Sequence, residues 1–302
     1  MAVVAHSGKS MGGGLGQFRE TLLGAGVTDP LWLEIAKGGQ APLCARRAVD
    51  EGADLLFVWG GDGTVQRCID VVAGTGTTLA IVPAGTANLL ARNLGIPQDI
   101  DEAVDIGLHG PRQHIDTATV NGEHFAVMAG AGLDALMIDD ADAGLKDRFG
   151  RAAYLWTGAR NLNASPVRAV VEVEGRPFFR GVVTCVLFGN LSDIGGGVEL
   201  FEGARADDGL LEFGVVSAKS RAQWVRTMGR VVLGRSENSP FVTTGRGTSI
   251  RVTFDHPTPY ELDGGARKAT KKLKVKVRPA SVEVCMPRPQ AEPEKDRTPD
   301  HG

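Results

Sequence analysis

The sequence predicts an α/β domain followed by an antiparallel β-sandwich domain. The chain has 302 residues, which is long enough for two domains. In its first third, short apolar runs alternate with segments of helical spacing, an order typical of a parallel sheet covered by helices on both faces. After Pro111 the chain changes to runs in which apolar and polar residues alternate, which favours antiparallel strands in a sandwich.

Three apolar runs in the first third are expected to be buried strands. They lie near residue 3, at 54–59 and at 79–83. The apolar residues between and after these runs recur with helical spacing, at 18–26, 42–52, 65–73, 88–95 and 100–108. Strands and helices that follow one another in this way predict a parallel sheet.

The remainder of the chain is rich in strand-like runs. Asn121-Gly122 joins two apolar runs within 114–132, and this dipeptide is the strongest short signal for a hairpin. Further strand-like runs follow at 167–175, 178–190, 210–217, 248–255, 272–277 and 281–286. Helical stretches interrupt them at about 154–162 and 221–233. The division that we predict is an α/β domain at 1–112, a sandwich domain at 113–286 and a polar, Pro-rich, disordered tail at 287–302.

Composition and charge restrict the possible functions. With 42% hydrophobic and 23% charged residues the chain can bury a sizeable core, and its net charge of −3 gives no global basic field for nucleic acid. The four cysteines are scattered without metal-like spacing, which favours buried free thiols in a reducing compartment. The sequence contains neither a run of 18 apolar residues nor a signal peptide, so we expect a cytoplasmic protein.

A first candidate binding loop, GGDGT, follows the apolar run at 54–59. It consists of Gly60, Gly61, Asp62, Gly63 and Thr64. Glycines at the carboxyl end of a parallel strand let backbone N–H groups approach phosphate oxygens, and the N-terminus of the next helix adds positive potential. Asp62 is suited to hold a cation or order water, and Thr64 to donate a hydrogen bond. A tight strand-to-helix turn would also need glycines, but this combination of residues favours phosphate.

A second candidate loop, PAGTAN at 83–88, lies between the next strand and the next helix. Gly85, Thr86 and Asn88 again place a glycine and two hydrogen-bonding side chains at the carboxyl end of a strand. Open parallel sheets bind ligands along that edge. Two such loops on consecutive strands are harder to explain as turns alone.

A third candidate, HSGKS at 6–10, follows the first strand. It lacks the preceding glycine of a Walker A loop, because Val3 stands in that position, so we exclude a P-loop NTPase. A turn with Ser7, Gly8 and Lys9 is still suited to contact phosphate. A solvated lysine on a surface loop is an equally good interpretation.

Together, GGDGT at 60–64 and PAGTANLLARNLGIP at 83–97 resemble the diacylglycerol kinase catalytic family, which includes bacterial diacylglycerol and lipid kinases and sphingosine and ceramide kinases. The resemblance continues in GAGLDALM at 130–137, in the spaced Lys146, Gly150 and Tyr154, in ADDGLLEF at 206–213 and in ELDGG at 261–265. It covers about residues 3–286, in the order that the family has.

This resemblance implies a nucleotide-binding α/β domain like that of NAD kinases and phosphofructokinases, and a cleft between it and the sandwich. ATP is expected to lie against Ser7 and Gly8, the loop at 61–67 and Thr86. A structural Mg²⁺ is expected beside Asp208, with the backbone carbonyls of Arg205 and Leu210 as partners, because hard cations prefer oxygen ligands. A second Mg²⁺ would bridge the nucleotide phosphates.

Asp263 is the predicted catalytic base, or a partner of the base, since a lipid hydroxyl must lose its proton as it attacks the γ-phosphorus. Without the resemblance, Asp263-Gly264 would be interpreted as a simple turn between two strands. The family's usual Glu two residues after this Asp is Gly265 here. Other departures from the family pattern lie before Ser7, where Val4-Ala5-His6 replaces Asn-Pro, and at Gln66-Arg67, Leu89 and Ile35.

A lipid kinase needs an apolar cleft and access to a membrane. Apolar side chains that could line the cleft, or simply pack in the core, are Phe125, Met128, Leu136, Met137, Phe149, Tyr154, Leu155 and Trp156. The basic stretch at 267–274 could meet anionic headgroups as a peripheral membrane contact, or could be a solvated loop and strand.

The leading hypothesis is therefore an ATP- and Mg²⁺-dependent lipid kinase, and two alternatives remain. One is a NAD-kinase-like enzyme, and the other is a catalytically degenerate nucleotide-binding regulator, which Gly265 favours. The lipid that is phosphorylated stays open, and a homodimer is compatible with the sequence.

Overall fold

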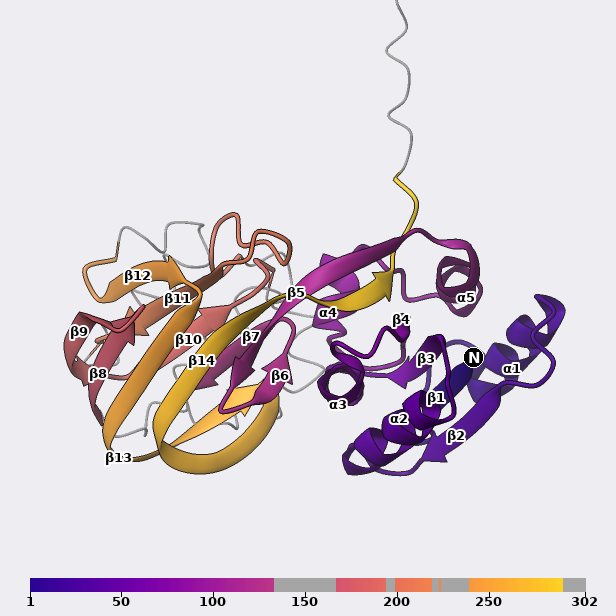
Figure 1. Ribbon diagram of the computed structural model, residues 1–302, viewed down its shortest axis with the longest axis horizontal. Coiled ribbons are helices and arrows are strands. Elements are labelled where there is room, and N and C mark those ends of the chain that lie inside the picture. Colours follow the sequence, from indigo (N-terminus) through magenta and orange to yellow (C-terminus); the bar gives the residue numbers. More distant parts are fainter. Residues whose placement is uncertain (133–166, 194–198, 219–222, 224–238, 290–302) are drawn as a thin grey trace, which may run out of the picture.

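A computed structural model describes residues 1–132, 167–193, 199–218, 223 and 239–289. Two lobes lie side by side in Figure 1, an N-terminal α/β lobe and a C-terminal lobe of strands. Several sequence predictions lie outside the described residues, namely Lys146, Gly150, Tyr154, the helix at 154–162, nearly all of the helix at 221–233 and the tail from 290.

The N-terminal lobe contains the predicted parallel sheet. Its strands run in the order β4-β3-β1-β2 and are β1 (Ala2–His6), β2 (Leu31–Ile35), β3 (Leu55–Gly60) and β4 (Thr78–Pro83). All residues of β3 and β4 are buried, which explains their continuous apolar runs. Hydrophobic pattern does not single out β2, because this edge strand exposes Glu34 and only half-buries Leu31 and Trp32.

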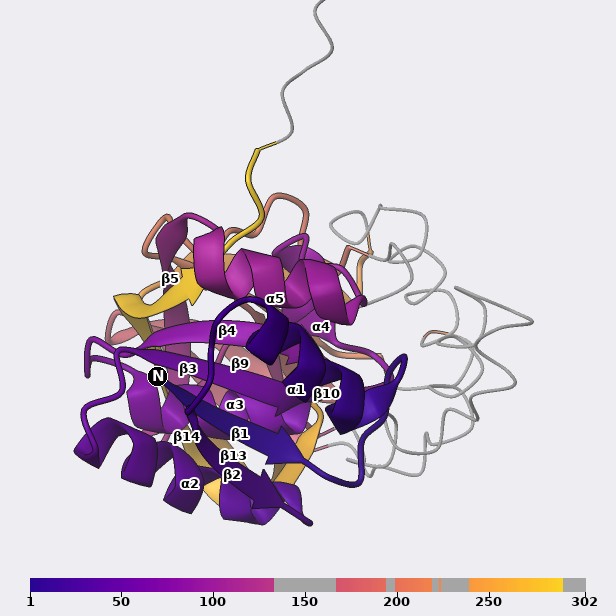
Figure 2. The ribbon, with the colours of Figure 1, turned by 90° about the vertical axis from the view of Figure 1, so that its right-hand side faces the viewer.

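Helices cover this sheet in two pairs. The helices are α1 (Gly14–Gly24), η1 (Gly38–Gln40), α2 (Ala41–Asp50), α3 (Asp62–Val72), α4 (Leu89–Asn93) and α5 (Ile100–His109). α1 packs against α5, and α2 packs against α3, on opposite faces of the sheet (Figures 1 and 2). The chain leaves β1 toward β2 and then crosses back to β3, so the strand order reverses between β1 and β3. In open α/β sheets ligands bind beside the carboxyl ends of the strands at such a point.

The C-terminal lobe is a sandwich of antiparallel strands. The strands are β5 (Arg112–Val120), β6 (Glu123–Phe125), β7 (Met128–Ala131), β8 (Val167–Val173), β9 (Arg176–Val183), β10 (Cys185–Gly189), β11 (Leu211–Val216), β12 (Val242–Gly247), β13 (Ser249–Leu262) and β14 (Gly265–Cys285). The predicted Asn121-Gly122 turn is confirmed, since both residues have positive φ (53° and 98°) between β5 and β6.

Two strand predictions are wrong in their boundaries. The run at 178–190 is two strands, since the chain breaks at Thr184, whose N–H donates to the carbonyl of Val216. Conversely, the runs at 272–277 and 281–286 belong to the single strand β14, which bends where its register with β5 shifts between Arg278 and Val282. Ala280 has a φ of 47° at this bend.

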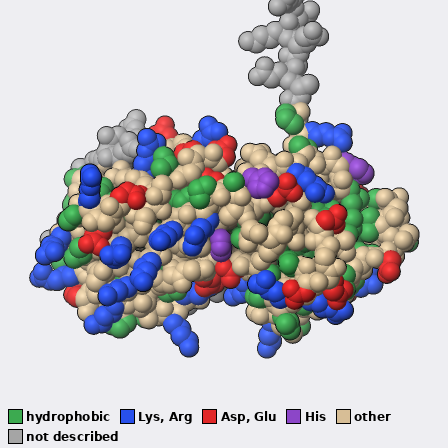
Figure 3. All heavy atoms as spheres, viewed as in Figure 1, with side chains coloured by type: hydrophobic (Ala, Val, Ile, Leu, Met, Phe, Trp, Pro, Cys, Tyr) green, Lys and Arg blue, Asp and Glu red, His purple; other side chains and the backbone are tan. Residues whose placement is uncertain are grey.

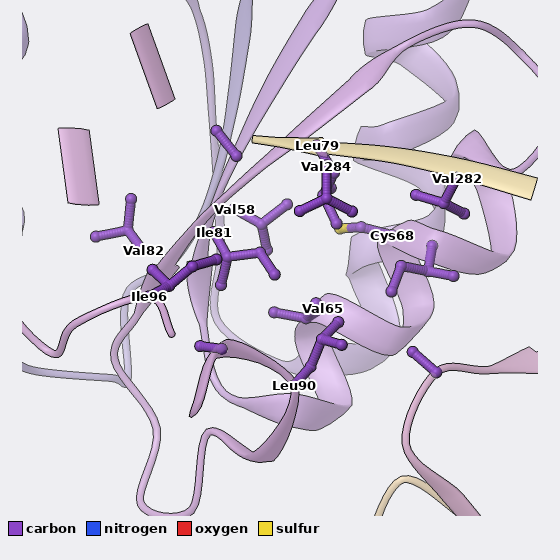
Figure 4. Close-up of a cluster of buried hydrophobic side chains, with 14 of the residues drawn as sticks. Val58, Val65, Cys68, Leu79, Ile81, Val82, Leu90, Ile96, Val282 and Val284 are labelled. Atoms are coloured by element: carbon purple, nitrogen blue, oxygen red, sulfur yellow. The ribbon is translucent and has the colours of Figure 1, made fainter. Parts of the chain in front are cut away.

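The two lobes share one hydrogen-bonded sheet. The end of β14 pairs in parallel with β4, through Val284 and Leu79. Figure 4 shows Val282 and Val284 of β14 among the side chains of the N-terminal core, near Leu79 and Cys68. A second core fills the sandwich and includes Phe188. The continuous sheet fixes how the lobes face each other.

The predicted free thiols are confirmed for all four cysteines. Cys68, Cys185 and Cys285 are buried and Cys44 is half-buried. Among the described helices, none has the length and apolar character needed to cross a bilayer.

Candidate active site

The GGDGT and PAGTAN loops touch at the carboxyl edge of the parallel sheet. A Cβ placed on Gly85 would lie only 2.4 Å from the Cα of Gly61, and one placed on Gly61 would lie 3.0 Å from the Cα of Gly85. The two backbones therefore approach at a distance that only glycine allows. The structure thus brings together the two loops that the sequence singled out.

Asp62 lies where the helices α3 and α4 begin. The backbone N–H of Thr64 donates to the carbonyl of Gly61 at 2.9 Å and starts α3. The Asp62 Oδ1 accepts a long hydrogen bond of 3.4 Å from the N–H of Leu90 in the first turn of α4. Burial raises the pKa of Asp62, and nearby backbone amides, that of Leu90 first among them, oppose this shift. Gly60 and Gly63 complete the turn, and Thr64 packs over Gly60.

Asn88 shapes the PAGTAN loop from inside. Its φ is 49°, its Oδ1 accepts from the N–H of Gly85 at 2.9 Å, and its Nδ2 donates to the carbonyl of Gly85 at 2.8 Å. Both ends of the Asn88 amide are therefore used within the loop. Thr86 is exposed at the tip, where its hydroxyl can reach a ligand.

The HSGKS loop at 6–10 is exposed, and its polar groups are largely used in hydrogen bonds within the protein. Ser7 donates from its N–H and its hydroxyl to the carbonyl of Ile35, at 2.9 and 3.2 Å. The N–H of Gly8 donates to Nδ1 of His6 at 3.1 Å. The indole of Trp59 in β3 donates to the carbonyl of Lys9 at 3.3 Å and ties this loop to the sheet. Phosphate contact through Ser7 or Gly8 would replace internal hydrogen bonds, whereas the Lys9 side chain is exposed.

Asp263 comes from the sandwich lobe and points inward. Asp263 and Gly264 both have positive φ, 44° and 78°, and form a tight hairpin turn between β13 and β14. The carboxylate accepts the backbone N–H groups of Ala126, Val127 and Met128, at 2.8 to 2.9 Å. The turn and an inward carboxylate are therefore both present.

The carboxylates of Asp263 and Asp62 lie close enough to interact. Burial raises the pKa of Asp263 to about 6, the three amide hydrogen bonds oppose this shift, and the charge of Asp62 adds to it. The side chain of Asp263 is almost completely buried, at 5% exposure. A buried carboxylate with a pKa near the working pH is typical of groups that take part in proton transfer.

Glu261 is a second buried carboxylate that sequence reasoning missed. Its Oε2 accepts the N–H of Gly264 at 2.9 Å. Burial raises the pKa of Glu261 to about 8, and the charge of Asp263 adds to this shift. The available signal was its place near the end of β13, two residues before Asp263, which puts both carboxylates beside the same turn.

A second missed feature is a clamp formed by Arg267, Glu123 and Gln66. Arg267 Nε donates to both carboxylate oxygens of Glu123, at 2.9 and 2.8 Å, and Nη2 donates to Oε1 of Gln66 at 3.2 Å. The Nε2 of Gln66 in turn donates to the carbonyl of His124 at 2.6 Å. The clamp therefore joins α3 of the nucleotide lobe to β6 and β14 of the sandwich.

Two departures from the family pattern meet at this clamp. Gln66 is one of them, and Gly265 is the other. A Cβ on Gly265 would lie 2.7 Å from Nη1 of Arg267, which donates to the carbonyl of Gly265 at 2.8 Å. The guanidinium of Arg267 thus occupies the space into which a side chain at position 265 would begin.

Comparisons with known proteins agree with this architecture. The diacylglycerol kinase catalytic domain model matches residues 4–120, and the YegS C-terminal NAD kinase beta sandwich-like domain model matches residues 127–286. The chain belongs to the diacylglycerol kinase family. It is 28% identical to a Bacillus subtilis diacylglycerol kinase, over 75% of this chain and 76% of that protein. It is 30% identical to a Pseudomonas fluorescens protein named "Probable lipid kinase YegS-like", over 83% of each chain.

Solved structures share the fold. A Bacillus anthracis diacylglycerol kinase superposes with a TM-score of 0.75 at 24% identity, covering 95% of this chain and 96% of that chain. An NAD kinase from Archaeoglobus fulgidus, solved in complex with ATP, superposes with a TM-score of 0.52 at 11% identity, covering 94% and 92%. The lipid kinase relatives are therefore much closer than the NAD kinase.

The predicted metal loop at 205–210 is held by hydrogen bonds and an ion pair of its own residues. Asp208 is exposed, and its Oδ1 accepts the N–H of Leu210 at 3.0 Å, while Arg205 pairs with Asp207. Within the described ranges, no three acidic, His or Cys side chains gather into a metal site.

One observation does fit a cation beside Asp208. The Oε2 atom of Glu212 is buried with no hydrogen-bond partner among the described residues. Burial raises the pKa of Glu212, and the charge of Asp208 adds to the shift. A hard cation at this loop would satisfy such oxygens. The metal role of Asp208 and of the Arg205 and Leu210 carbonyls stays a prediction.

Two buried polar side chains connect this loop to the Asp263 cradle. Asp116 accepts the N–H of Gly209 at 2.7 Å, and its carbonyl accepts from Nδ2 of Asn190 at 2.8 Å. Asn190 Nδ2 also donates to the carbonyl of Ala126 at 2.8 Å. The segment 126–128, whose amides hold Asp263, is thus fixed by Asp116 and Asn190, and neither residue belongs to a recognisable sequence motif.

The predicted lipid-lining side chains can be followed only in part. Phe125 is fully buried and Met128 is 9% exposed, so both pack in the cores. The remaining candidates lie outside the described residues, namely Leu136, Met137, Phe149, Tyr154, Leu155 and Trp156.

Proposed function

We propose that this protein is an ATP-dependent lipid kinase that transfers the γ-phosphate to a hydroxyl of a diacylglycerol-like or sphingoid lipid. The observation that carries the proposal is the contact between the Gly61 and Gly85 turns with Asp263 close to Asp62. Such a site combines donors for phosphates with carboxylates from both lobes. Membership of the lipid kinase family supports the same assignment.

The nucleotide lobe supplies the phosphate contacts in this proposal. ATP phosphates would lie against the backbone of 61–67 and the start of α3, where the helix dipole favours anions. Thr86 and Lys9 are exposed on the neighbouring loops and would add a hydroxyl and a positive charge. Mg²⁺ bound with the nucleotide would neutralise charge that develops during transfer, and a separate structural Mg²⁺ would be held beside Asp208.

Asp263 is the proposed base. The lipid O–H proton would pass to the Asp263 carboxylate while the lipid oxygen bonds to the γ-phosphorus and the bond to the β-γ bridging oxygen breaks, releasing ADP. Its pKa of about 6 leaves most of the carboxylate ionised above pH 7. The three amide hydrogen bonds fix the carboxylate, so little reorganisation is needed as the proton moves.

Purified protein tests the proposal directly. The protein is incubated with ATP, Mg²⁺ and separately dioctanoylglycerol, sphingosine, a total membrane lipid extract or NAD, and products are identified by mass spectrometry. We expect a phosphorylated lipid, whose formation Asp263→Asn abolishes. The matched control is Asp255→Asn, at an exposed position on β13, which should leave product formation unchanged. Product from NAD alone would instead support the NAD kinase alternative.

A second candidate function follows from Gly265. If the missing carboxylate at this position is essential in the family, the protein is a nucleotide-binding regulator without kinase activity. Binding of ATP without product from any lipid would favour that role. Retained activity would mean that Asp263, with Glu261 beside it, suffices.

A further inference from the structure

We propose that the exposed face of β14 is the surface on which this kinase docks onto an anionic lipid bilayer. The proposal rests on the proposed lipid kinase function. Lys272, Lys274, Lys276 and Arg278 are exposed at alternate positions, while Leu273, Val275 and Val277 between them are buried in the sandwich core. Alternate residues of a strand point to one face, so the four cations form a row about 6.8 Å apart.

The row is almost free of compensating charge. From Gly265 to Arg278 the strand carries seven Lys and Arg residues and no Asp or Glu, in a chain whose net charge is −3. Across the part of the chain that the structure describes, no ion pair includes any of the four cations. Their neighbour Arg251 lies opposite Lys274 on β13 and is already paired with Glu172.

This arrangement is unfavourable for the folded protein alone. Like charges directly opposite each other on paired strands, as at Arg251 and Lys274, destabilise a sheet, and a partner with negative charge relieves the repulsion. The space-filling view in Figure 3 shows Lys and Arg side chains gathered along the C-terminal lobe on one face of the molecule. A broad sheet face with a line of cations complements a planar anionic surface.

The lipid substrate of the proposed function favours a membrane over other anionic partners. β14 begins at Gly265, next to Arg267, which contacts Gln66 of α3, and the row starts five residues later. On β5 the residues that pair with Lys276 and Arg278 are Thr119 and Thr117, and both are buried, so the exposed face does not continue across β5 at these positions. Docking through this row would hold the enzyme on the bilayer that carries its proposed lipid substrate.

Vesicle sedimentation tests the docking surface. Wild-type protein is compared with Lys272→Gln/Lys274→Gln/Lys276→Gln and with the matched triple Lys→Arg variant, on vesicles of phosphatidylcholine with or without phosphatidylglycerol. Each cation near an anionic surface contributes about five-fold to partitioning, so we expect roughly a 10²-fold loss for the Gln variant. The Arg variant should bind like the wild type, and no form should bind pure phosphatidylcholine.

Three outcomes would overturn the proposal. They are equal binding of the Gln variant, binding that does not require phosphatidylglycerol, and an RNA oligonucleotide that competes fully with vesicles through the same lysines. Circular dichroism checks that the Gln variant folds. Activity on dispersed dioctanoylglycerol separates the two proposals: a chain that docks through these lysines yet phosphorylates no lipid would refute only the kinase, and an active chain that docks without them would refute only this surface.

Discussion

Replacing Arg267 with Ala should destabilise the protein, because this side chain holds the two lobes together. The side chain of Arg267 is 14% exposed and that of Glu123 is 32% exposed. The guanidinium donates to Glu123, to Gln66 and to the carbonyls of Gly265 and Ala266. The substitution leaves a partly buried Glu123 carboxylate without its cation and three other acceptors without their donor.

The magnitude follows from the burial of the pair. Breaking a fully buried ion pair destabilises a protein by about 3–5 kcal/mol, and breaking an exposed pair by about 0–1 kcal/mol. The partial exposure of Glu123 places Arg267→Ala between these limits, at about 2–3 kcal/mol of unfolding free energy. Because Arg267 lowers the pKa of Glu123 against the effect of burial, the variant should also raise that pKa.

Urea denaturation followed by circular dichroism measures the effect. The matched control is Arg251→Ala, because its pair with Glu172 is 60% and 33% exposed and the expected loss is below about 1 kcal/mol. Lipid phosphorylation should fall with Arg267→Ala and stay unchanged with Arg251→Ala. Equal destabilisation by both substitutions would refute the view that Arg267 clamps the lobes together.

A double-mutant cycle tests the link between Arg267 and Gly265. A Cβ at position 265 would lie 2.7 Å from Nη1 of Arg267, so Gly265→Ala should destabilise the wild type by about 1–3 kcal/mol. In the Arg267→Ala background the carbonyl of Leu262, at 3.3 Å, remains near this Cβ but the guanidinium does not, so the same substitution should cost much less. Additive effects in denaturation would contradict the contact.

Three further predictions concern the loops and the buried carboxylates. Gly85→Ala should abolish ATP binding by calorimetry, because its Cβ would lie 2.4 Å from Gly61 Cα. Gly16→Ala should bind as the wild type, because among the described residues its Cβ would meet nothing within 4 Å. Normal binding by Gly85→Ala would exclude the loop contact. Glu261→Gln should make stability less dependent on pH. Folded Glu261 keeps its proton up to about pH 8 and the unfolded group loses it near pH 4.5, so stability falls between these values as pH rises. Between pH 5 and pH 8 the free energy of unfolding of the variant should rise by a few kcal/mol relative to that of the wild type, as measured by denaturation. No such rise would mean that Glu261 is exposed to water in the folded protein. Finally, Asp263→Asn should lower thermal stability as well as activity, since an amide NH₂ in place of one oxygen opposes the N–H groups of 126–128; loss of activity alone would show that this cradle adds nothing to folding.

The sequence predicted the nucleotide lobe well because its signals are local. Strands β3 and β4 are buried on both faces and end in glycine turns, so composition and order along the chain were sufficient. β2 was harder to predict from the sequence, because this edge strand exposes Glu34 and therefore has no continuous apolar run. In the sandwich, the break at Thr184 and the bend at Ala280 depend on partners far along the chain, Val216 and β5.

The same distinction separates the predicted site residues from the missed ones. Asp62, Gly85 and Asp263 stand in short motifs that mark them. The clamp does not, because Arg267 is 144 residues from Glu123 and 201 from Gln66 in sequence. Glu261 looked like an ordinary strand residue until its burial beside Asp263 was known. Long-range packing supplies these contacts, and no local pattern encodes them.

Hydrogen–deuterium exchange with and without ATP and Mg²⁺ tests the central claim most directly. If the touching glycine turns hold the triphosphate, peptides that cover 60–67 and 83–88 should exchange more slowly when nucleotide is present, together with the 126–128 cradle of Asp263. Protection confined to other parts of the chain, or no protection at saturating ATP, would contradict the nucleotide site and the kinase assignment that depends on it.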